Sequence, residues 1–158
     1  MSAPEHQNTQ PEPASKNRLR LWLRLLKTTR IIEARLRENL RLQFATTLPR
    51  FDVLAALARY DKGLKMSHLS DVLRVSNGNV TGIVDRLLKD GLVVRVPIKG
   101  DRRALLVRLT GKGSEEFKVQ AEAHESWVND MLGEISATET SEFSDRLDLM
   151  LRSLEKKV

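Results

Sequence analysis

Residues 76–109 read SNGNVTGIVDRLLKDGLVVRVPIKGDRRALLVRL, and this stretch decides the fold. Ser76 is a residue type that favours a helix N-cap, and Gly91 suits the left-handed position after a helix end. Apolar side chains recur between them at the spacing of one helical face: Val80, Ile83, Val84, Leu87 and Leu88. The period then changes to the alternation typical of strands. A helix followed directly by a β-hairpin is therefore expected.

The expected hairpin pairs residues 92–96 with residues 105–109, and its tip covers residues 98–103. In the second run, Leu105, Val107 and Leu109 alternate with Leu106 and Arg108, as in a strand with one buried side. The turn residues between the two runs are Pro97, Gly100 and Asp101.

A shorter helix is expected before the capped one. Ser67 is its expected N-cap, and its buried side is formed by Leu69, Val72 and Leu73. The tight Arg74-Val75 connection joins the two helices into a helix-turn-helix. With the hairpin, this pattern is a winged helix-turn-helix, which offers one helix to the major groove of DNA and one loop to the minor groove.

Helices are also expected on both sides of this region, so the fold class is mainly α. A long amphipathic helix covers residues 19–45, with an apolar arc of Trp22, Leu25, Leu26, Ile32, Leu36 and Leu40. Pro49 opens a second helix and Gly63 ends it. Two helices follow Thr110, the first carrying Phe117, Ala121, His124, Trp127, Val128 and Met131, the second Phe143, Leu147, Met150, Leu151 and Leu154.

The charge is unevenly distributed over a chain of net charge +6. Residues 16–50 carry ten Lys and Arg against two Asp and Glu, and residues 86–113 carry eight against two. Residues 114–158 carry five against eleven. Residues 1–15 are polar and Pro-rich, which predicts a disordered tail. Two basic blocks favour an acidic partner such as nucleic acid.

Several classes of protein are excluded by composition. The chain has no cysteine, which excludes disulfides, thiolate zinc sites and a catalytic cysteine. Its three histidines, His6, His68 and His124, have no nucleophile–base or metal-spaced companions, so no enzyme, catalytic site, cofactor or metal is expected. No apolar stretch approaches the roughly 20 residues of a membrane span or resembles a secretion signal, and a cytoplasmic protein without membrane contact is expected.

The helix after Ser76 begins with short polar side chains at the end that would enter a groove. Asn77 and Asn79 can pair with adenine, while Ser76 and Thr81 can bond base edges or phosphates. Ordinary capping explains Ser76 and Asn77 equally well, so both alternatives stay open for them. Asn79 and Thr81 have no capping role. Two cations one turn apart, Arg86 and Lys89, could hold phosphates.

The hairpin tip adds three cations within five positions, Lys99, Arg102 and Arg103. A solvated turn is the alternative, but the position after the capped helix favours a minor-groove probe. The Asp101 carboxylate is expected to fix the geometry of Arg103, two residues later, so that the guanidinium is preorganised.

These residues resemble the MarR family of bacterial transcription regulators. The likeness runs from Phe51 to about Gly113 and depends most on residues 75–81, on Asp101-Arg102-Arg103 and on Leu109-Thr110. It implies a homodimer on a palindromic operator in double-stranded DNA, with Asn77, Asn79, Thr81 and Arg86 on the recognition helix and Asp101 with Arg103 on the wing. The implied division is a tail (1–15), an N-terminal dimerisation helix (16–48), a winged helix-turn-helix (49–113) and C-terminal dimerisation helices (114–158).

The resemblance also implies release from DNA by a small molecule that binds differently to two spacings of the recognition helices. The residues proposed for an apolar effector pocket are Trp22, Leu26, Phe44, Phe51, His124, Trp127 and Val128, although most of them equally suit a core or a dimer interface. The Arg-rich first helix is similar to that of a MarR subgroup that responds to aroyl- or hydroxycinnamoyl-coenzyme A thioesters. Arg20, Arg24, Arg35, Arg37 and Arg41 would then hold the effector's phosphates; a solvated face or contact with DNA phosphates are the alternatives.

The function expected is that of a sequence-specific regulator, a repressor of an operon for aromatic-compound catabolism, released by an aromatic acyl-coenzyme A thioester. Two alternatives remain at this stage: a MarR-type regulator responding to a free aromatic acid, and a dimer that binds nucleic acid through its basic surface without sequence choice.

Overall fold

The computed structural model describes residues 13–156, apart from the side chain of Arg102. The chain divides into two units, residues 1–35 and residues 36–158. The described part of the first unit belongs to helix α1, which spans Ala14–Phe44. This helix begins five residues before the predicted start, because the carbonyl of Pro13 already accepts a hydrogen bond from the amide of Lys16, at 2.9 Å. Residues 1–12 of the predicted tail lie outside the described residues.

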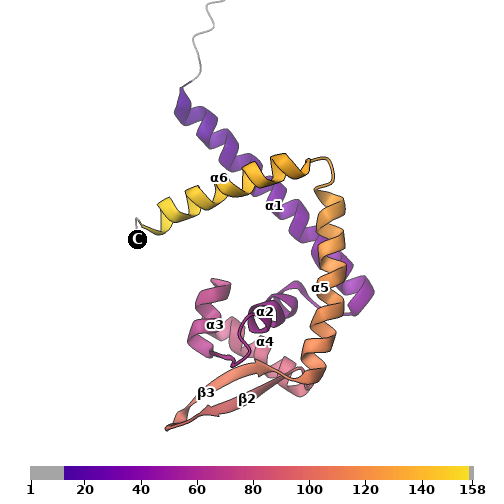
Figure 1. Ribbon diagram of the computed structural model, residues 1–158, viewed down its shortest axis with the longest axis vertical. Coiled ribbons are helices and arrows are strands. Elements are labelled where there is room, and N and C mark those ends of the chain that lie inside the picture. Colours follow the sequence, from indigo (N-terminus) through magenta and orange to yellow (C-terminus); the bar gives the residue numbers. More distant parts are fainter. Residues whose placement is uncertain (1–12, 157–158) are drawn as a thin grey trace, which may run out of the picture. The chain divides into compact units, whose positions relative to one another are not determined.

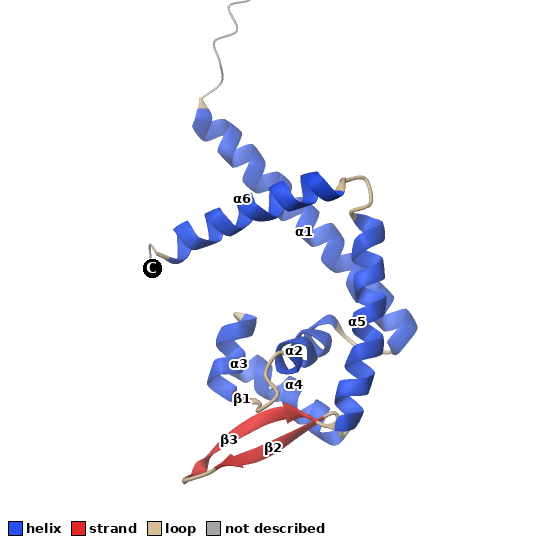
Figure 2. Cartoon of the chain, in the orientation of Figure 1, coloured by secondary structure: helices blue, strands red, loops and turns tan. Residues whose placement is uncertain are grey.

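The second unit holds the end of α1 and the remaining helices and strands (Figures 1 and 2). Apart from one short additional strand, their order is the order predicted from the sequence. The helices are α2 (Leu48–Ala58), α3 (Met66–Leu73), α4 (Asn77–Lys89), α5 (Gly111–Met131) and α6 (Ala137–Glu155). The strands are β1 (Leu64–Lys65), β2 (Val93–Ile98) and β3 (Asp101–Leu109), in the antiparallel sheet order β1-β3-β2. The winged helix-turn-helix is confirmed, and the short strand β1 was not predicted.

The core of this unit lies between α2, α3, α4 and the sheet. Its most deeply buried side chains include Val53, Leu69, Val80, Val84, Leu87 and Val107, each 0% exposed. The predicted buried side of α3 is wrong at Val72, which is 37% exposed. Ser70 is buried on α3 instead, and its hydroxyl donates to the carbonyl of Met66 at 3.0 Å, so that the buried polar group is paired.

Two predicted helix ends are wrong. α2 ends at Ala58 and not at Gly63, which lies before β1 at φ +90°, where a Cβ atom would come within 2.6 Å of the carbonyl oxygen of Val107. The N-cap of α3 is Lys65 and not Ser67, because β1 leads directly into the helix. The predicted start of α2 is confirmed: Pro49 lies in its first turn, and the Thr47 hydroxyl accepts from the amide of Arg50.

The hairpin is longer than predicted. Pro97 is not a turn residue but lies in β2 opposite Leu105, next to a register shift between Pro97 and Ile98. A proline fits there because β2 is an edge strand, which pairs only with β3 among residues 13–156. The turn is reduced to Lys99 and Gly100, and Gly100 supplies its left-handed conformation at φ +92°.

The start of α5 is fixed against the end of α4. Thr110 caps α5 by accepting from the amide of Gly113 at 3.0 Å, while its hydroxyl donates to the carbonyl of Gly91 at 2.6 Å. Gly91 has the predicted left-handed conformation, at φ +72°. Gly113 is buried against the backbone of Leu92, with which an added Cβ atom would collide.

We expect Gly113→Ala to lower the free energy of unfolding by about 1–3 kcal/mol, because helix and backbone must separate to admit the methyl group. Urea denaturation followed by circular dichroism measures this loss. Gly111→Ala is the matched control, since a Cβ atom there meets nothing within 4 Å; it should stay within about 0.5 kcal/mol of the wild type. Equal stability of the two variants would contradict this packing.

Candidate nucleic-acid interface

One face of α4 is buried, and the other is exposed and polar. Val80, Val84 and Leu87 are 0% exposed and fix the rotation of the helix about its axis. The predicted DNA-contacting residues of this helix, Asn77, Asn79, Thr81, Arg86 and Lys89, are all exposed on its surface, together with the N-cap residue Ser76. The structure therefore brings this part of the predicted site onto one accessible helix.

The hydroxyl groups at the start of α4 differ in their hydrogen bonds. Ser76 occupies the N-cap position, as predicted, but its side chain makes no capping hydrogen bond. Thr81, which is exposed, donates its hydroxyl to the carbonyl of Asn77 at 2.9 Å, and its oxygen can still accept a hydrogen bond. The capping alternative for Ser76 thus loses its main support, whereas Thr81 has a local bond that the sequence did not predict.

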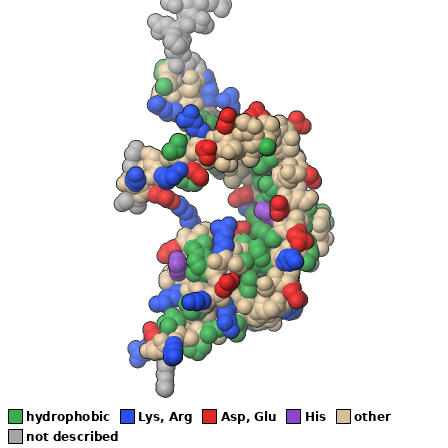
Figure 3. Space-filling model, viewed as in Figure 1, with side chains coloured by type: hydrophobic (Ala, Val, Ile, Leu, Met, Phe, Trp, Pro, Cys, Tyr) green, Lys and Arg blue, Asp and Glu red, His purple; other side chains and the backbone are tan. Residues whose placement is uncertain are grey.

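At the wing, Asp101 acts through the backbone. Its carboxylate accepts a hydrogen bond from the main-chain amide of Arg103 at 3.0 Å. This bond agrees with the prediction that the Asp101 carboxylate fixes the geometry of Arg103, and it does so by orienting the backbone that carries this cation. Lys99, Asp101 and Arg103 are exposed. They lie at the hairpin end of the winged helix-turn-helix (residues 49–113), which we call the lobe, and Figure 3 shows Lys and Arg side chains at this end. The predicted role of Arg102 concerns a side chain outside the described part.

Ion pairs separate two kinds of cation on this lobe. Arg95 of β2 binds Asp85 of α4 at 2.8 Å, and Arg50 of α2 binds Asp90 at the end of α4 at 2.5 Å. Among the described residues, no ion pair involves Arg86, Lys89, Lys99 or Arg103. These four cations remain available for phosphates.

A groove lies beside the exposed face of α4. It is bounded by the first turn of α2 on one side and by α4 on the other, and its lining includes Arg50, Asn79 and Arg86. The lining thus combines two arginines with an amide that can read a base edge, although it also holds Asp52 and apolar residues such as Leu73 and Ile83. This arrangement suits a polyanion with hydrogen-bonding edges.

The predicted effector residues of the second unit form two ring contacts. His124 stacks on Phe51 with ring centroids 4.6 Å apart, and Trp127 approaches Phe44 at 6.1 Å. Val128 lies on the same helix and lines a hollow at the α5–α6 corner. Trp22 and Leu26 belong to the first unit, where Trp22 is exposed and Leu26 half-buried, so their place in a common pocket stays a prediction.

The predicted phosphate-holding arginines of α1 are all exposed. Arg41 is committed to Glu38 through two hydrogen bonds, at 2.7 and 2.9 Å, which lower the pKa of the Glu38 carboxyl. Arg20 lies 3.4 Å from the side-chain oxygen of Asn17, and Arg37 also has a partner. The role of this set, which includes Arg24 and Arg35, stays a prediction.

Sequence reasoning missed the contacts that hold the end of α4. Arg50 and Asp90 are 40 residues apart, and Lys112 donates to the main-chain carbonyl of Asp90 at 2.8 Å. No local pattern signals such pairs. Gln120 was missed as well: it is 1% exposed, donates to Glu116 at 3.2 Å, and its side-chain oxygen has no hydrogen-bond partner among the described residues.

Residues 13–156 hold neither a metal-binding cluster nor a membrane-spanning helix. No group of three or more His, Asp or Glu side chains there could hold a metal ion. In the same range, no helix has the length and apolar character needed to cross a membrane.

Stability should depend on pH through His124, because burial lowers the pKa of this imidazole below its ordinary 6.5. The unfolded state then binds the proton more tightly, so the free energy of unfolding should fall as pH drops through 6.5 and level off below the folded-state pKa. Urea midpoints measured between about pH 8 and about pH 5 test this. His124→Gln should remove this component, and His68→Gln, at an exposed position, should retain it; equal profiles would contradict the assignment.

Comparison with known proteins gives concordant results. The sequence pattern of the MarR family matches residues 46–104. BadR of Rhodopseudomonas palustris, described as a transcriptional activatory protein, is 33% identical over 60% of this chain and 56% of its own length. PecS of Dickeya dadantii, an HTH-type transcriptional regulator, is 33% identical over 56% of this chain and 55% of its own. The chain thus spans just over half the length of these curated relatives.

A solved structure covers more of the molecule. The MarR family transcriptional regulator from Silicibacter pomeroyi has a TM-score of 0.75 and is 35% identical, over 90% of this chain and 99% of its own. These proteins are transcription regulators, which bears out the expectation that this chain is not an enzyme. The chain belongs to the MarR family of transcription regulators.

Proposed function

We propose that this protein is a sequence-specific DNA-binding regulator of transcription. The observation that carries the proposal is the exposed face of α4, where base-reading amides stand beside cations without ion-pair partners in the described chain. A second set of cations stands on the β2–β3 wing of the same lobe. Helix and wing together can engage a major groove and the neighbouring minor groove.

We further propose that it binds as a homodimer on a palindromic operator. α6 has no buried residue, although its apolar side chains recur at helical spacing: Phe143, Leu147, Met150, Leu151 and Leu154 are 43–61% exposed. An apolar helix face of this length is typical of an interface. A second copy would cover it and supply the second recognition helix that a palindrome requires. The predicted division into dimerisation and DNA-binding regions rests on this arrangement.

The proposed signal is an aromatic small molecule, and the regulated genes would serve aromatic-compound catabolism. Support comes from the ring pairs Phe51–His124 and Phe44–Trp127, which join α5 to α2 and to the end of α1. A ligand that wedges between such rings would change the spacing of the recognition helices. The exposed arginines of α1 favour a phosphate-bearing ligand such as an acyl-coenzyme A thioester.

Two substitutions on the lobe should have different effects in gel-shift titrations with the DNA upstream of the protein's own gene. Asn79→Ala should relax preference at one base pair, by about 1–3 kcal/mol, because an amide that reads a base edge is lost.

Arg103→Ala should weaken binding to every sequence and reduce the salt slope by about one, because one phosphate contact is lost. Lys118→Ala, which removes an exposed cation of α5, is the control.

Competition with excess unrelated DNA tests the proposal as a whole. A regulator of this kind keeps its own site under competition, whereas a basic dimer without sequence choice does not. If Asn79→Ala lowered the affinity for all DNA sequences equally, Asn79 would position the protein on DNA rather than recognise a base. Because BadR is described as an activatory protein, the accompanying promoter assay should score both repression and activation.

Titration of the protein–DNA complex with aromatic acids and with their coenzyme A thioesters tests the effector. We expect the thioester to release DNA at concentrations where the free acid does not. Arg24→Gln with Arg35→Gln should weaken the thioester effect only, because the phosphates lose their partners. Release by the free acid alone would favour the simpler aromatic-acid response, and release by neither would contradict the proposed signal.

A further inference from the structure

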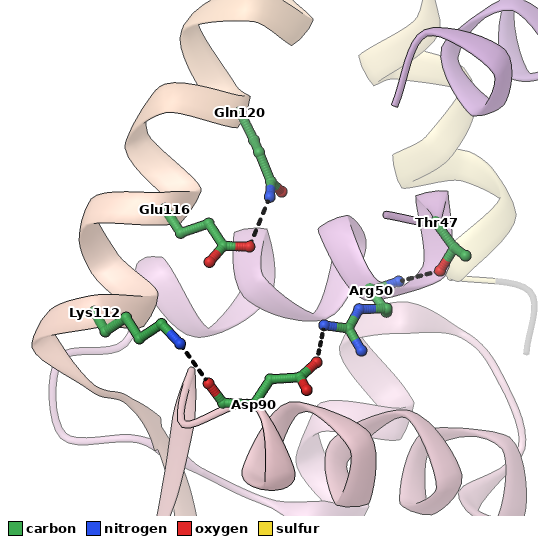
Figure 4. Close-up of polar contacts among 6 residues, drawn as sticks. All are labelled: Thr47, Arg50, Asp90, Lys112, Glu116 and Gln120. Carbon is green, nitrogen blue, oxygen red and sulfur yellow. Dashed lines mark hydrogen bonds and ion pairs between the residues drawn. The ribbon is translucent and has the colours of Figure 1, made fainter. Parts of the chain in front are cut away.

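We propose that Arg50, Asp90 and Lys112 form a positioning cluster. This cluster couples the tilt of α4 to the distance between the first turns of α2 and α5. The inference rests on the proposed DNA-binding function and assigns a role to the contacts at the C-terminal end of α4. Its core is a convergence of two cations on one residue. The Arg50 guanidinium binds the Asp90 carboxylate at 2.5 Å, and Lys112 binds the Asp90 main-chain carbonyl at 2.8 Å (Figure 4).

Asp90 stands where an acidic residue is unfavourable for the helix itself. It is the C-cap of α4, at the negative end of the helix dipole, where cations are preferred. Helix stability therefore does not account for the carboxylate. The Arg50 guanidinium accounts for it, since a charge-assisted hydrogen bond offsets the unfavourable position and fixes the direction of the helix end.

Each cation comes from the first turn of a different helix. Arg50 is held in the first turn of α2, where its own amide donates to the capping hydroxyl of Thr47. Lys112 lies in the first turn of α5, next to Thr110, whose hydroxyl donates to the Gly91 carbonyl. The end of α4 is thus bound to both helices, and a change in their separation must move it.

The other end of α4 carries the residues that read DNA. The helix has 13 residues and a length of about 20 Å. A small displacement at Asp90 therefore becomes a change in the direction of the helix axis, because Val84, near the middle of α4, is held in the core. The polar residues at the start of α4, which include Asn79, follow that change. Proteins use discrete repacking of this kind to convert a local shift into a change of affinity.

Direct contact of Arg50 with DNA phosphates is the competing explanation, since Arg50 also lines the groove beside Asn79 and Arg86. The two explanations differ in what Asp90 contributes. A phosphate contact is strengthened when Asp90 is neutralised, whereas a positioning pair is broken. An exchange of the two charges also separates them, because it restores the pair but removes the cation from the groove.

The test compares Arg50→Gln, Asp90→Asn and the exchanged double variant Arg50→Asp with Asp90→Arg. Each single variant should weaken binding to the operator about tenfold while leaving the salt slope unchanged. Each should also discriminate less between operators whose half-sites stand one base pair closer or further apart. The exchanged variant should recover most of the affinity and the spacing preference.

Glu155→Gln is the matched control, because it breaks another exposed ion pair, which joins Arg74 at the end of α3 to Glu155 of α6 at 3.0 Å, without touching α4. Gel filtration should show the wild-type oligomeric state for this variant, because Glu155 lies on the helix proposed for the dimer interface. Melting temperatures of all variants exclude loss of folding as the cause. Wild-type affinity in both single variants would overturn the inference. So would a salt slope reduced by about one in Arg50→Gln without recovery in the exchanged variant. A wild-type chain without any sequence preference would instead overturn the proposed function.

Discussion

The burial of one side of α4 is the constraint on which the rest of the winged lobe depends. Val80, Val84 and Leu87 are completely enclosed by α2, α3 and the sheet, and a helix with three such residues has one possible rotation about its axis. The same rotation turns Asn79 and Arg86 outward. One sequence pattern, with apolar residues at helical spacing and polar residues between them, therefore has two results. It buries the apolar side chains in the core, and it exposes the polar side chains that can contact DNA.

The buried apolar side chains fix the rotation of α4 about its axis, but they do not fix the direction of that axis. The ion pairs of α4 with neighbouring elements fix this direction. Asp85 is held by Arg95 of β2, and Asp90 is held by Arg50 of α2. Both acidic side chains are half exposed, so these pairs add little to stability. Their placement along α4, one at the sheet and one at the helix end, makes them orienting contacts.

Local patterns predicted the parts of the structure that local forces determine. The α4 helix and the hairpin were predictable because cap, stripe and turn residues are close in sequence. Predictions failed at Ser67 and Gly63, because a two-residue strand before α3 pairs with β3 more than 40 residues later. The site shows the same division: the exposed amides were predictable, whereas the partner of Asp90 depends on tertiary structure. Asp101 was correctly chosen as a fixing residue, but its partner is a backbone amide.

Ion pairing also changes what the charge blocks mean. Formal counting gives residues 16–50 a larger positive charge than residues 86–113. However, Arg50 of the first block is paired with Asp90 of the second block. This pair removes one available cation from residues 16–50 and one anion from residues 86–113, so the two blocks differ less than their counts suggest. In the second block Arg95 is paired, while Arg86 and Arg103 have no ion-pair partner in the described chain. A phosphate backbone near the lobe would therefore meet its strongest attraction at the exposed side of α4 and at the wing, where side chains able to read base edges are also found.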